Sequence, residues 1–299
     1  MSLTSLALRF LFKRNDDRRD AGLTTPGDIV RRDNIPYGPD PRWNLLDVYR
    51  PRGEAGKLPV IVSVHGGGWV YGDKERYQYY CMSLAQEGFA VVNFTYRLAP
   101  RHKHPAQLED TAAVFAWVQA RAEEYGFDPE HVFGVGDSAG AQILGLYACL
   151  CTNAAFAEEM RIPVAAAACP RAVALNCGVY QVDAGQRKSL TARLMKDYLP
   201  GGGTAEELRQ VSVMAHIGGA FPPAFVMTAE GDFLADQAAP LAEALQALGV
   251  PAEYRYYGGP GQVLGHVFHC NMRSEEAMAC NRDECGFFRR FIRPATTEG

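Results

Sequence analysis

The chain has 299 residues, of which 47% are hydrophobic and 21% charged, with a formal net charge of −4. This composition excludes a disordered chain and a basic nucleic-acid binder, and no apolar run is long enough to span a membrane. None of the eight cysteines forms a Cys-x-x-Cys pair typical of zinc sites. They fit buried, reduced thiols, which predicts a cytoplasmic protein.

The first apolar segment, residues 3–12, is followed by Lys13 and Arg14. This order is the reverse of a secretory signal, in which the basic residues come first. We expect an amphipathic helix that packs on the body of the protein. A helix lying on a membrane surface is the alternative.

From about residue 45, strand-like and helix-like patterns alternate along the chain. Near-continuous apolar strands between helices predict one α/β domain over residues 1–299, with a doubly wound, mostly parallel sheet covered by helices on both faces. The predicted strands are 45–49, 60–64, 90–95, 132–135, 173–179, 224–228 and 253–257. The predicted helices are 105–125, 139–151, 240–248 and 275–292.

Two segments do not fit this alternation, residues 1–40 and residues 181–218, the second with a helix predicted at 186–198. Surplus segments in an α/β enzyme commonly cover the carboxyl ends of the strands, where ligands bind. We therefore expect the two to form a small helical cap. A surface excursion without a role is the alternative.

The strongest chemical signal is Gly136-Asp137-Ser138-Ala139-Gly140, which lies between a predicted strand and a predicted helix. G-x-S-x-G in this context is typical of a nucleophile elbow, a strained turn that projects the serine hydroxyl. Glycine is needed two residues to either side of the serine because a side chain there would collide with the turn. The turn also points the backbone N–H of Ala139 toward an anion.

A second motif, His65-Gly66-Gly67-Gly68-Trp69, directly follows the strand predicted at 60–64. Consecutive glycines leave backbone amides free to approach a ligand. An HGGG loop of this kind supplies a further oxyanion-hole donor to an elbow serine. The nearby Trp69 and Tyr71 either line an acyl pocket or simply pack.

A serine nucleophile needs a base, and in this fold class the acid and then the histidine follow the serine. Three histidines come after Ser138, namely His216, His266 and His269. His216 precedes the last two strands, whereas His266 follows the final strand and a glycine-rich stretch. We assign His266 as the base, with His269 as its rival.

The orienting acid is expected at the carboxyl end of the strand at 224–228. Asp232 lies there, and we assign it to this role. Asp236 fits better as a cap of the following helix, and Glu230 is the third candidate.

Together these motifs resemble the α/β-hydrolases of the hormone-sensitive-lipase-like esterase group, close to bacterial acetyl esterases and carboxylesterases. The resemblance spans about residues 44–293. It rests on HGGGW with Gly72-Asp73, Tyr96-Arg97-Leu98-Ala99-Pro100, the helix from Pro105 to Asp110, GDSAG, Gly231-Asp232-Phe-Leu-Ala-Asp236 and His266-Val-Phe268. The resemblance implies an oxyanion hole made by Gly67, Gly68 and Ala139. It also implies that Asp137 braces the HGGG loop.

We expect a serine hydrolase that cleaves carboxylic esters of short acyl chains through an acyl-enzyme, without a metal or organic cofactor. Acetylated sugars are among the candidate substrates. Segment 46–51 also resembles kynurenine formamidases, so an amidase with the same triad is the alternative. A non-catalytic hydrolase-fold binding protein is a remote one. A homodimer is among the expected assemblies, and His102 and His104 are interpreted as solvated loop residues.

Overall fold

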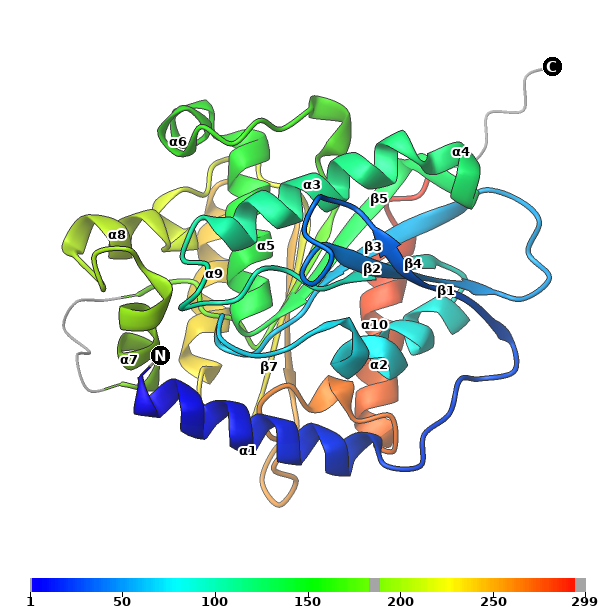
Figure 1. The fold of residues 1–299 in the computed structure, drawn as a ribbon, viewed down its shortest axis with the longest axis horizontal. Coiled ribbons are helices and arrows are strands. Elements are labelled where there is room, and N and C mark those ends of the chain that lie inside the picture. Colours follow the sequence, from blue (N-terminus) through cyan, green and yellow to red (C-terminus); the bar gives the residue numbers. More distant parts are fainter. Residues whose placement is uncertain (1, 183–188, 294–299) are drawn as a thin grey trace.

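A computed structural model describes residues 2–182 and 189–293 and places an eight-stranded sheet at the centre of the molecule (Figure 1). The strand order is β1-β2-β4-β3-β5-β6-β7-β8. β2 is antiparallel to both β1 and β4, and all other neighbouring strands are parallel. The strands are β1 (Ile29–Pro36), β2 (Leu45–Pro51), β3 (Leu58–Val64), β4 (Ala90–Phe94), β5 (Phe127–Asp137), β6 (Val173–Asn176), β7 (Ala224–Ala229) and β8 (Ala252–Tyr257).

Alternate residues of the strands face two separate hydrophobic cores, because successive side chains of a strand point to opposite faces of the sheet. Val60 and Val62 of β3 join the core beneath α3, α5 and α9, whereas Ile61 joins the core beneath α2 and α10. These helices are α2 (Lys74–Gln86), α3 (Ala106–Ala120), α5 (Ala139–Thr152), α9 (Ala235–Ala247) and α10 (Glu275–Arg289). The predicted doubly wound, mostly parallel sheet is therefore confirmed.

The first strand was not predicted, because its sequence carries few apolar residues. β1 reads Ile-Val-Arg-Arg-Asp-Asn-Ile-Pro and lies at the edge of the sheet, with a largely exposed burial pattern. Charged side chains are common on edge strands because they discourage pairing with other chains. Residues 29–36, expected within the first cap segment, thus belong to the sheet.

The other boundaries differ from prediction mainly at element ends. The helix expected over 105–125 is divided into α3 and the short α4 (Ala122–Tyr125). The strand expected over 173–179 ends at Asn176, because Cys177 takes a left-handed backbone conformation with φ of 47°. The helix expected over 240–248 begins earlier, at Ala235.

The remaining surplus segments contain helices that meet over the carboxyl ends of the strands. α1 (Leu3–Asp20) crosses this edge of the molecule and contacts α7 (Leu190–Tyr198) near the amino terminus (Figure 1). Asp197 of α7 accepts hydrogen bonds from the Ser2 N–H at 2.9 Å and from the Ser5 hydroxyl at 2.5 Å. After α7 come α8 (Ala205–Gln210) and the 3-10 turn η2 (Val213–Ala215). Residues 186–188 of the helix predicted at 186–198 lie outside the described residues.

Within the described residues, no single helix has the length and apolar composition needed to cross a bilayer. Helices α5 and α6 (Ala154–Met160) meet that criterion only as a pair, which is bent by 113°.

Candidate active site

Ser138 lies on a sharp turn between the carboxyl end of β5 and the start of α5. Its backbone has φ of 52° and ψ of −118°, an uncommon conformation for a residue with a side chain. A β-carbon on Gly140 would overlap the carbonyl oxygen of Val64, and one on Gly136 would lie 2.6 Å from the carbonyl oxygen of Gly140. The Ser138 N–H donates to the Asn176 carbonyl at 2.9 Å, which ties the turn to β6. Steric exclusion at both glycines therefore explains the G-x-S-x-G spacing.

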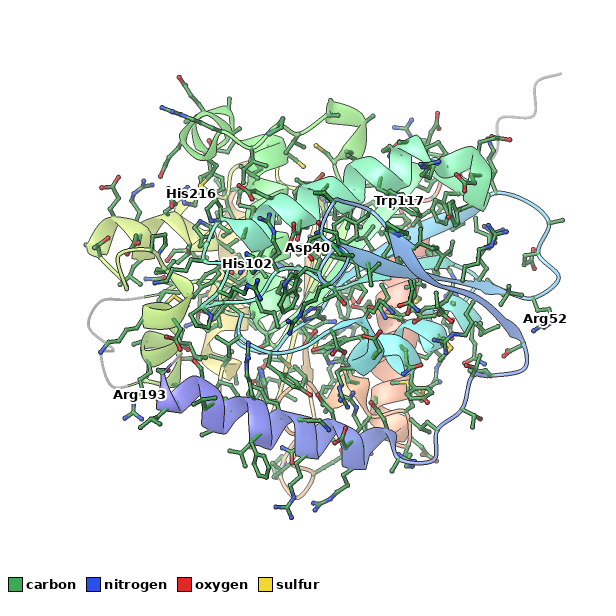
Figure 2. The ribbon with its side chains drawn as sticks, viewed as in Figure 1. Asp40, Arg52, His102, Trp117, Arg193 and His216 are labelled. Atoms are coloured by element: carbon green, nitrogen blue, oxygen red, sulfur yellow. The ribbon has the colours of Figure 1, made fainter. Side chains whose placement is uncertain are left out.

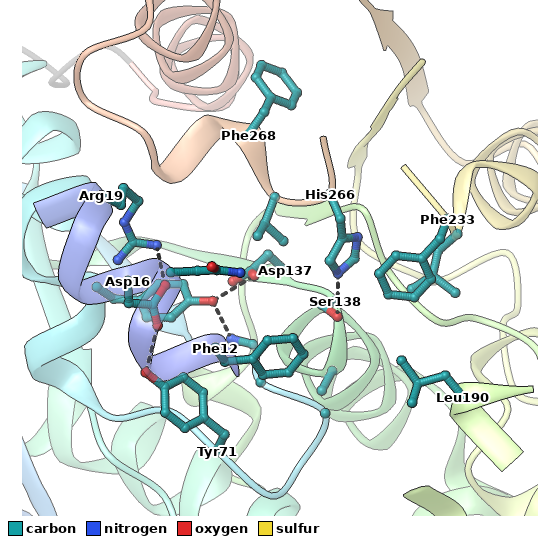
Figure 3. A pocket seen from close by; sticks show the side chains of 18 of the residues that line it. Phe12, Asp16, Arg19, Tyr71, Asp137, Ser138, Leu190, Phe233, His266 and Phe268 are labelled. Atoms are coloured by element: carbon teal, nitrogen blue, oxygen red, sulfur yellow. Dashed lines mark hydrogen bonds and ion pairs between the residues drawn. The ribbon is translucent and has the colours of Figure 1, made fainter. Parts of the chain in front are cut away.

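His266 connects the serine hydroxyl to a buried carboxylate. Figure 3 shows its contact with Ser138. Its Nε2 lies 2.9 Å from Ser138 Oγ, and its Nδ1 lies 2.6 Å from Asp232 Oδ1. A carboxylate accepts hydrogen bonds but does not donate them, so Nδ1 carries the proton and Nε2 is free to accept one from the serine. The structure thus brings together the three residues that sequence reasoning selected.

Asp232 is held as a carboxylate by several donors. Burial alone would raise the pKa of Asp232, but the hydrogen bond and charge of His266 lower that pKa to about 2. The Leu234 N–H donates to Oδ1 at 3.0 Å, and the Thr228 hydroxyl donates to Oδ2 at 2.7 Å. The anionic form can therefore orient His266 and stabilise a positive charge on its ring.

The rival histidines are engaged elsewhere. His216, labelled in Figure 2, stacks on Phe156 at 3.9 Å, and its Nε2 contacts the carbonyl oxygens of Arg209 and Gln210. His269 is fully buried, and burial lowers its pKa to about 3, so the ring is neutral.

The rival acids have other surroundings. Glu230 accepts a hydrogen bond from the Tyr256 hydroxyl at 2.5 Å, and Asp236 lies in the first turn of α9. Asp236 does not act as the expected cap, because α9 begins after Leu234 without a side-chain capping bond.

The HGGG loop presents backbone amides beside the serine. Gly67 and Gly68 have positive φ values of 114° and 59°, and a β-carbon on Gly67 would overlap the carbonyl oxygen of Tyr71. Within the described residues, the N–H groups of Gly67 and Gly68 donate to no protein atom. The Ala139 N–H is the first of α5 and has no partner within its helix. All three are therefore free to bind an anion.

Asp137 reaches the HGGG loop through a tyrosine. Its Oδ2 accepts a hydrogen bond from the Tyr77 hydroxyl at 2.7 Å, and the same hydroxyl accepts the Gly66 N–H at 2.9 Å. Burial raises the pKa of Asp137 to about 6, although the hydrogen bond from Tyr77 opposes this rise. The contact fits the bracing role that the resemblance implied. The contribution of Tyr77 could not be seen in the sequence, because it comes from α2.

A cavity of about 630 Å³ opens above Ser138, beneath α1 and α7. Trp69 and Tyr71 both line it, and each is also packed. Trp69 is 1% exposed, stacks on Tyr198 and donates its Nε1–H to Gln142 at 2.9 Å. The hydroxyl of Tyr71 donates to Asp16 of α1 at 2.8 Å.

Several lining residues were missed by sequence reasoning. α1 contributes Phe12, Asn15, Asp16, Arg18 and Arg19, and the loop after β7 contributes Phe233. No motif marks the residues of α1, which carries a run of charged residues after its apolar start, and Phe233 lies within the quoted Gly231–Asp236 stretch but was not assigned to the cavity.

One other prediction is changed by the structure. His104 was expected to be solvated but is buried, with its Nδ1 3.1 Å from the Tyr198 hydroxyl. Burial lowers the pKa of His104 to about 4.

Among the described residues, the cluster with spacing suited to a metal ion is Cys177, Asp232 and His266. Two of these three are already hydrogen bonded to each other, which favours a triad over a metal site.

Comparison with known proteins supports the class that the geometry defines. Residues 61–270 match the alpha/beta hydrolase fold family. The carboxylesterase NlhH of Mycobacterium tuberculosis is 32% identical over 230 residues, which cover 74% of this chain and 70% of that protein. The chain therefore belongs to the α/β-hydrolase family, within its hormone-sensitive-lipase-like esterase group, as the sequence motifs predicted.

Other relatives agree with this placement. Versiconal hemiacetal acetate esterase of Dothistroma septosporum is 38% identical over 97 residues, but the match covers only 30% of that protein. The crystal structure of esterase B from Lactobacillus rhamnosis superposes with a TM-score of 0.85 at 26% identity, covering 96% of this chain and 93% of that one. The predicted enzyme class, a carboxylic ester hydrolase, agrees with these names.

Proposed function

We propose that this protein is a serine carboxylesterase in which Ser138, His266 and Asp232 form the catalytic triad. The observation that carries the proposal is the continuous chain of contacts from Ser138 Oγ to His266 Nε2 at 2.9 Å and from His266 Nδ1 to Asp232 at 2.6 Å. A nucleophile, a base and an oriented acid in this order are the requirements for acyl transfer.

In this mechanism, Ser138 Oγ attacks the ester carbonyl carbon while His266 Nε2 takes the hydroxyl proton. The oxyanion that forms is bound by the N–H groups of Gly67, Gly68 and Ala139, and each such donor contributes on the order of 10²–10³ in rate. When the intermediate collapses, His266 gives its proton to the leaving alcohol. Water then attacks the acyl-enzyme by the same route and releases the acid.

The helices that cover the cavity support short acyl chains. α1 and α7 lie over the space that has to hold both parts of the ester. We propose that these helices act as the cap within a single domain. Among p-nitrophenyl esters of increasing chain length, turnover should be fastest below about eight carbons. Fastest turnover on longer chains would contradict this assignment.

An ester is preferred to a formamide because NlhH is named a carboxylesterase and the superposed Lactobacillus rhamnosis structure is named an esterase. We further propose a reducing compartment such as the cytoplasm, because all eight cysteines are free thiols. A non-catalytic role is disfavoured by the presence of a complete set of nucleophile, base, acid and oxyanion donors.

The direct test is Ser138→Ala, assayed on p-nitrophenyl butyrate and on N-formylkynurenine in parallel. We expect the wild type to hydrolyse the ester faster than the formamide, and the variant to lose both activities. Ester hydrolysis by S138A at the wild-type rate would contradict the proposal. Faster hydrolysis of the formamide would favour the amidase alternative.

A further inference from the structure

The cavity above Ser138 has two chemically different ends. Leu190 and Leu194 of α7 line one end with Val179 and Phe233, whereas polar residues of α1 line the other. Figure 3 shows Ser138 and His266 between Phe233 and Leu190 on one side and Asp16 and Arg19 on the other. A substrate that fills this cavity therefore meets an apolar surface in one direction and a charged one in the opposite direction.

Most charges at the polar end are already paired. Arg19 is 3.0 Å from Asp16 and 2.8 Å from Asp20, and Asp16 also accepts the Tyr71 hydroxyl. Arg273 donates to the carbonyl oxygens of Arg19 and Ala21, and so binds the carboxyl end of α1. These groups position α1 over the site, and their charges largely cancel.

Arg18 differs from these groups because its guanidinium has no ion pair or hydrogen-bond partner within the described residues. Asn15 and Asn271 also line the cavity. The Asn271 side-chain oxygen accepts the Arg273 N–H, which leaves its amide free to donate. The charged side chains that line the cavity are Arg18, Arg19 and Arg273 against Asp16 and Asp137, which gives 3 − 2 = +1 in a chain whose net charge is −4.

We propose that this polar end is a subsite for a carboxylate on the ester substrate, bound by Arg18 with the side-chain amides of Asn15 and Asn271. Guanidinium and amide groups donate hydrogen bonds to carboxylate oxygens, and a guanidinium stays charged throughout the working pH range. The inference rests on the proposed esterase function. It names the substrates as esters with a short apolar portion at one end and an acidic group at the other.

Two pairs of substrates test this subsite and identify the part of the ester that carries the acid. In one pair the carboxylate is on the acyl side, as in phenyl hydrogen adipate against methyl phenyl adipate. In the other pair it is on the alcohol side, as in 4-butyryloxybenzoate against its methyl ester. The readout is the ratio of kcat/KM for the acidic ester to that for the neutral ester, in low salt and in 0.5 M NaCl, where screening weakens exposed charge pairs.

We expect one of the two ratios to lie between about 3 and 10 in low salt. A charge-assisted hydrogen bond at a partly exposed site contributes an effect of this size. Arg18→Gln should bring that ratio close to unity. Arg14→Gln is the matched control, because Arg14 is an exposed arginine of the same helix that does not line the cavity. It should leave the ratio unchanged.

Ratios at or below unity for both pairs would overturn the subsite, as would a preference that R18Q does not reduce. In either case, rapid hydrolysis of the neutral esters would leave the esterase function intact. If none of the four esters is hydrolysed and Ser138 does not react with a fluorophosphonate, the esterase proposal itself fails, and the subsite fails with it.

Discussion

Replacing Asp232 with asparagine should separate the charge of this residue from its role in orienting His266. Asp232 Oδ1 accepts from His266 and from the Leu234 N–H, whereas Oδ2 accepts from the Thr228 hydroxyl. An asparagine that keeps its oxygen at the Oδ1 position retains the first two bonds. Its amide can donate to Thr228, because a hydroxyl also accepts. D232N should therefore preserve the orientation and tautomer of His266 and lose only the negative charge.

The size of the effect follows from the pKa of Asp232. The hydrogen bonds and the charge of His266, with the other donors, outweigh burial and lower that pKa from 3.8 to about 2. At 1.36 kcal/mol per pKa unit, this shift means that the site stabilises the negative charge of Asp232 by about 2 kcal/mol. Loss of the charge should lower kcat/KM for p-nitrophenyl butyrate by roughly 10- to 50-fold. D232A also removes the oriented acceptor, so its loss should reach about 10³–10⁴-fold.

Thr228 provides the matched control. T228V alone keeps both hydrogen bonds to Oδ1 and should remain close to wild type. In T228V/D232N the amide has no acceptor at position 228 and can turn its donor toward His266 Nδ1, so the loss should approach that of D232A. Initial rates of p-nitrophenol release would be compared at pH 8, with folding checked by circular dichroism. A D232N defect as large as that of D232A, with no further effect of T228V, would refute the reasoning.

Three further predictions concern the surroundings of the triad. Y77F removes the hydroxyl between Asp137 and Gly66, so kcat should fall about 10- to 100-fold with a smaller change in KM, while unchanged kcat would argue against the brace. G140A should abolish activity and lower the free energy of unfolding by several kcal/mol, because the added methyl group would overlap the backbone. A free energy of unfolding in urea close to that of the wild type would contradict the elbow geometry. Glu284 of α10 accepts hydrogen bonds from the Tyr80 hydroxyl and from the side chain of Asn176. Burial raises the pKa of Glu284 from 4.5 to about 7, so the free energy of unfolding of the wild type should fall as pH rises from about 4.5 to 7, by up to about 3 kcal/mol. E284Q should lack this part of the decline between pH 5 and pH 8, and identical pH profiles would show that Glu284 does not titrate as described.

The central sheet and the triad could be predicted because their signals are local. Most of the parallel strands contain a short apolar run, and Ser138, Asp232 and His266 each follow the carboxyl end of a parallel strand. Parallel strands bring these ends to one edge of the sheet, so chain order alone places the three side chains together. The elbow glycines add a steric requirement that is visible in the sequence.

Features that depend on contacts between distant segments could not be predicted in this way. β1 was missed because an edge strand needs no apolar face, and the burial of His104 depends on Tyr198, which lies 94 residues away. The lining of the cavity by α1 depends on Asp197 and Tyr71, which hold that helix over the site. The shape of the proposed cap is therefore a property of tertiary packing.

The most direct test of the triad is covalent labelling with a fluorophosphonate, followed by peptide mass spectrometry. The probe forms a phosphorus–oxygen bond with an activated serine as fluoride leaves, so it reports activation of the nucleophile independently of the ester chosen. We predict a single adduct, located on Ser138, that is absent in S138A and forms much more slowly in a His266→Ala variant. An ester-hydrolysing preparation whose adduct maps to another residue, or that carries none, would contradict the account.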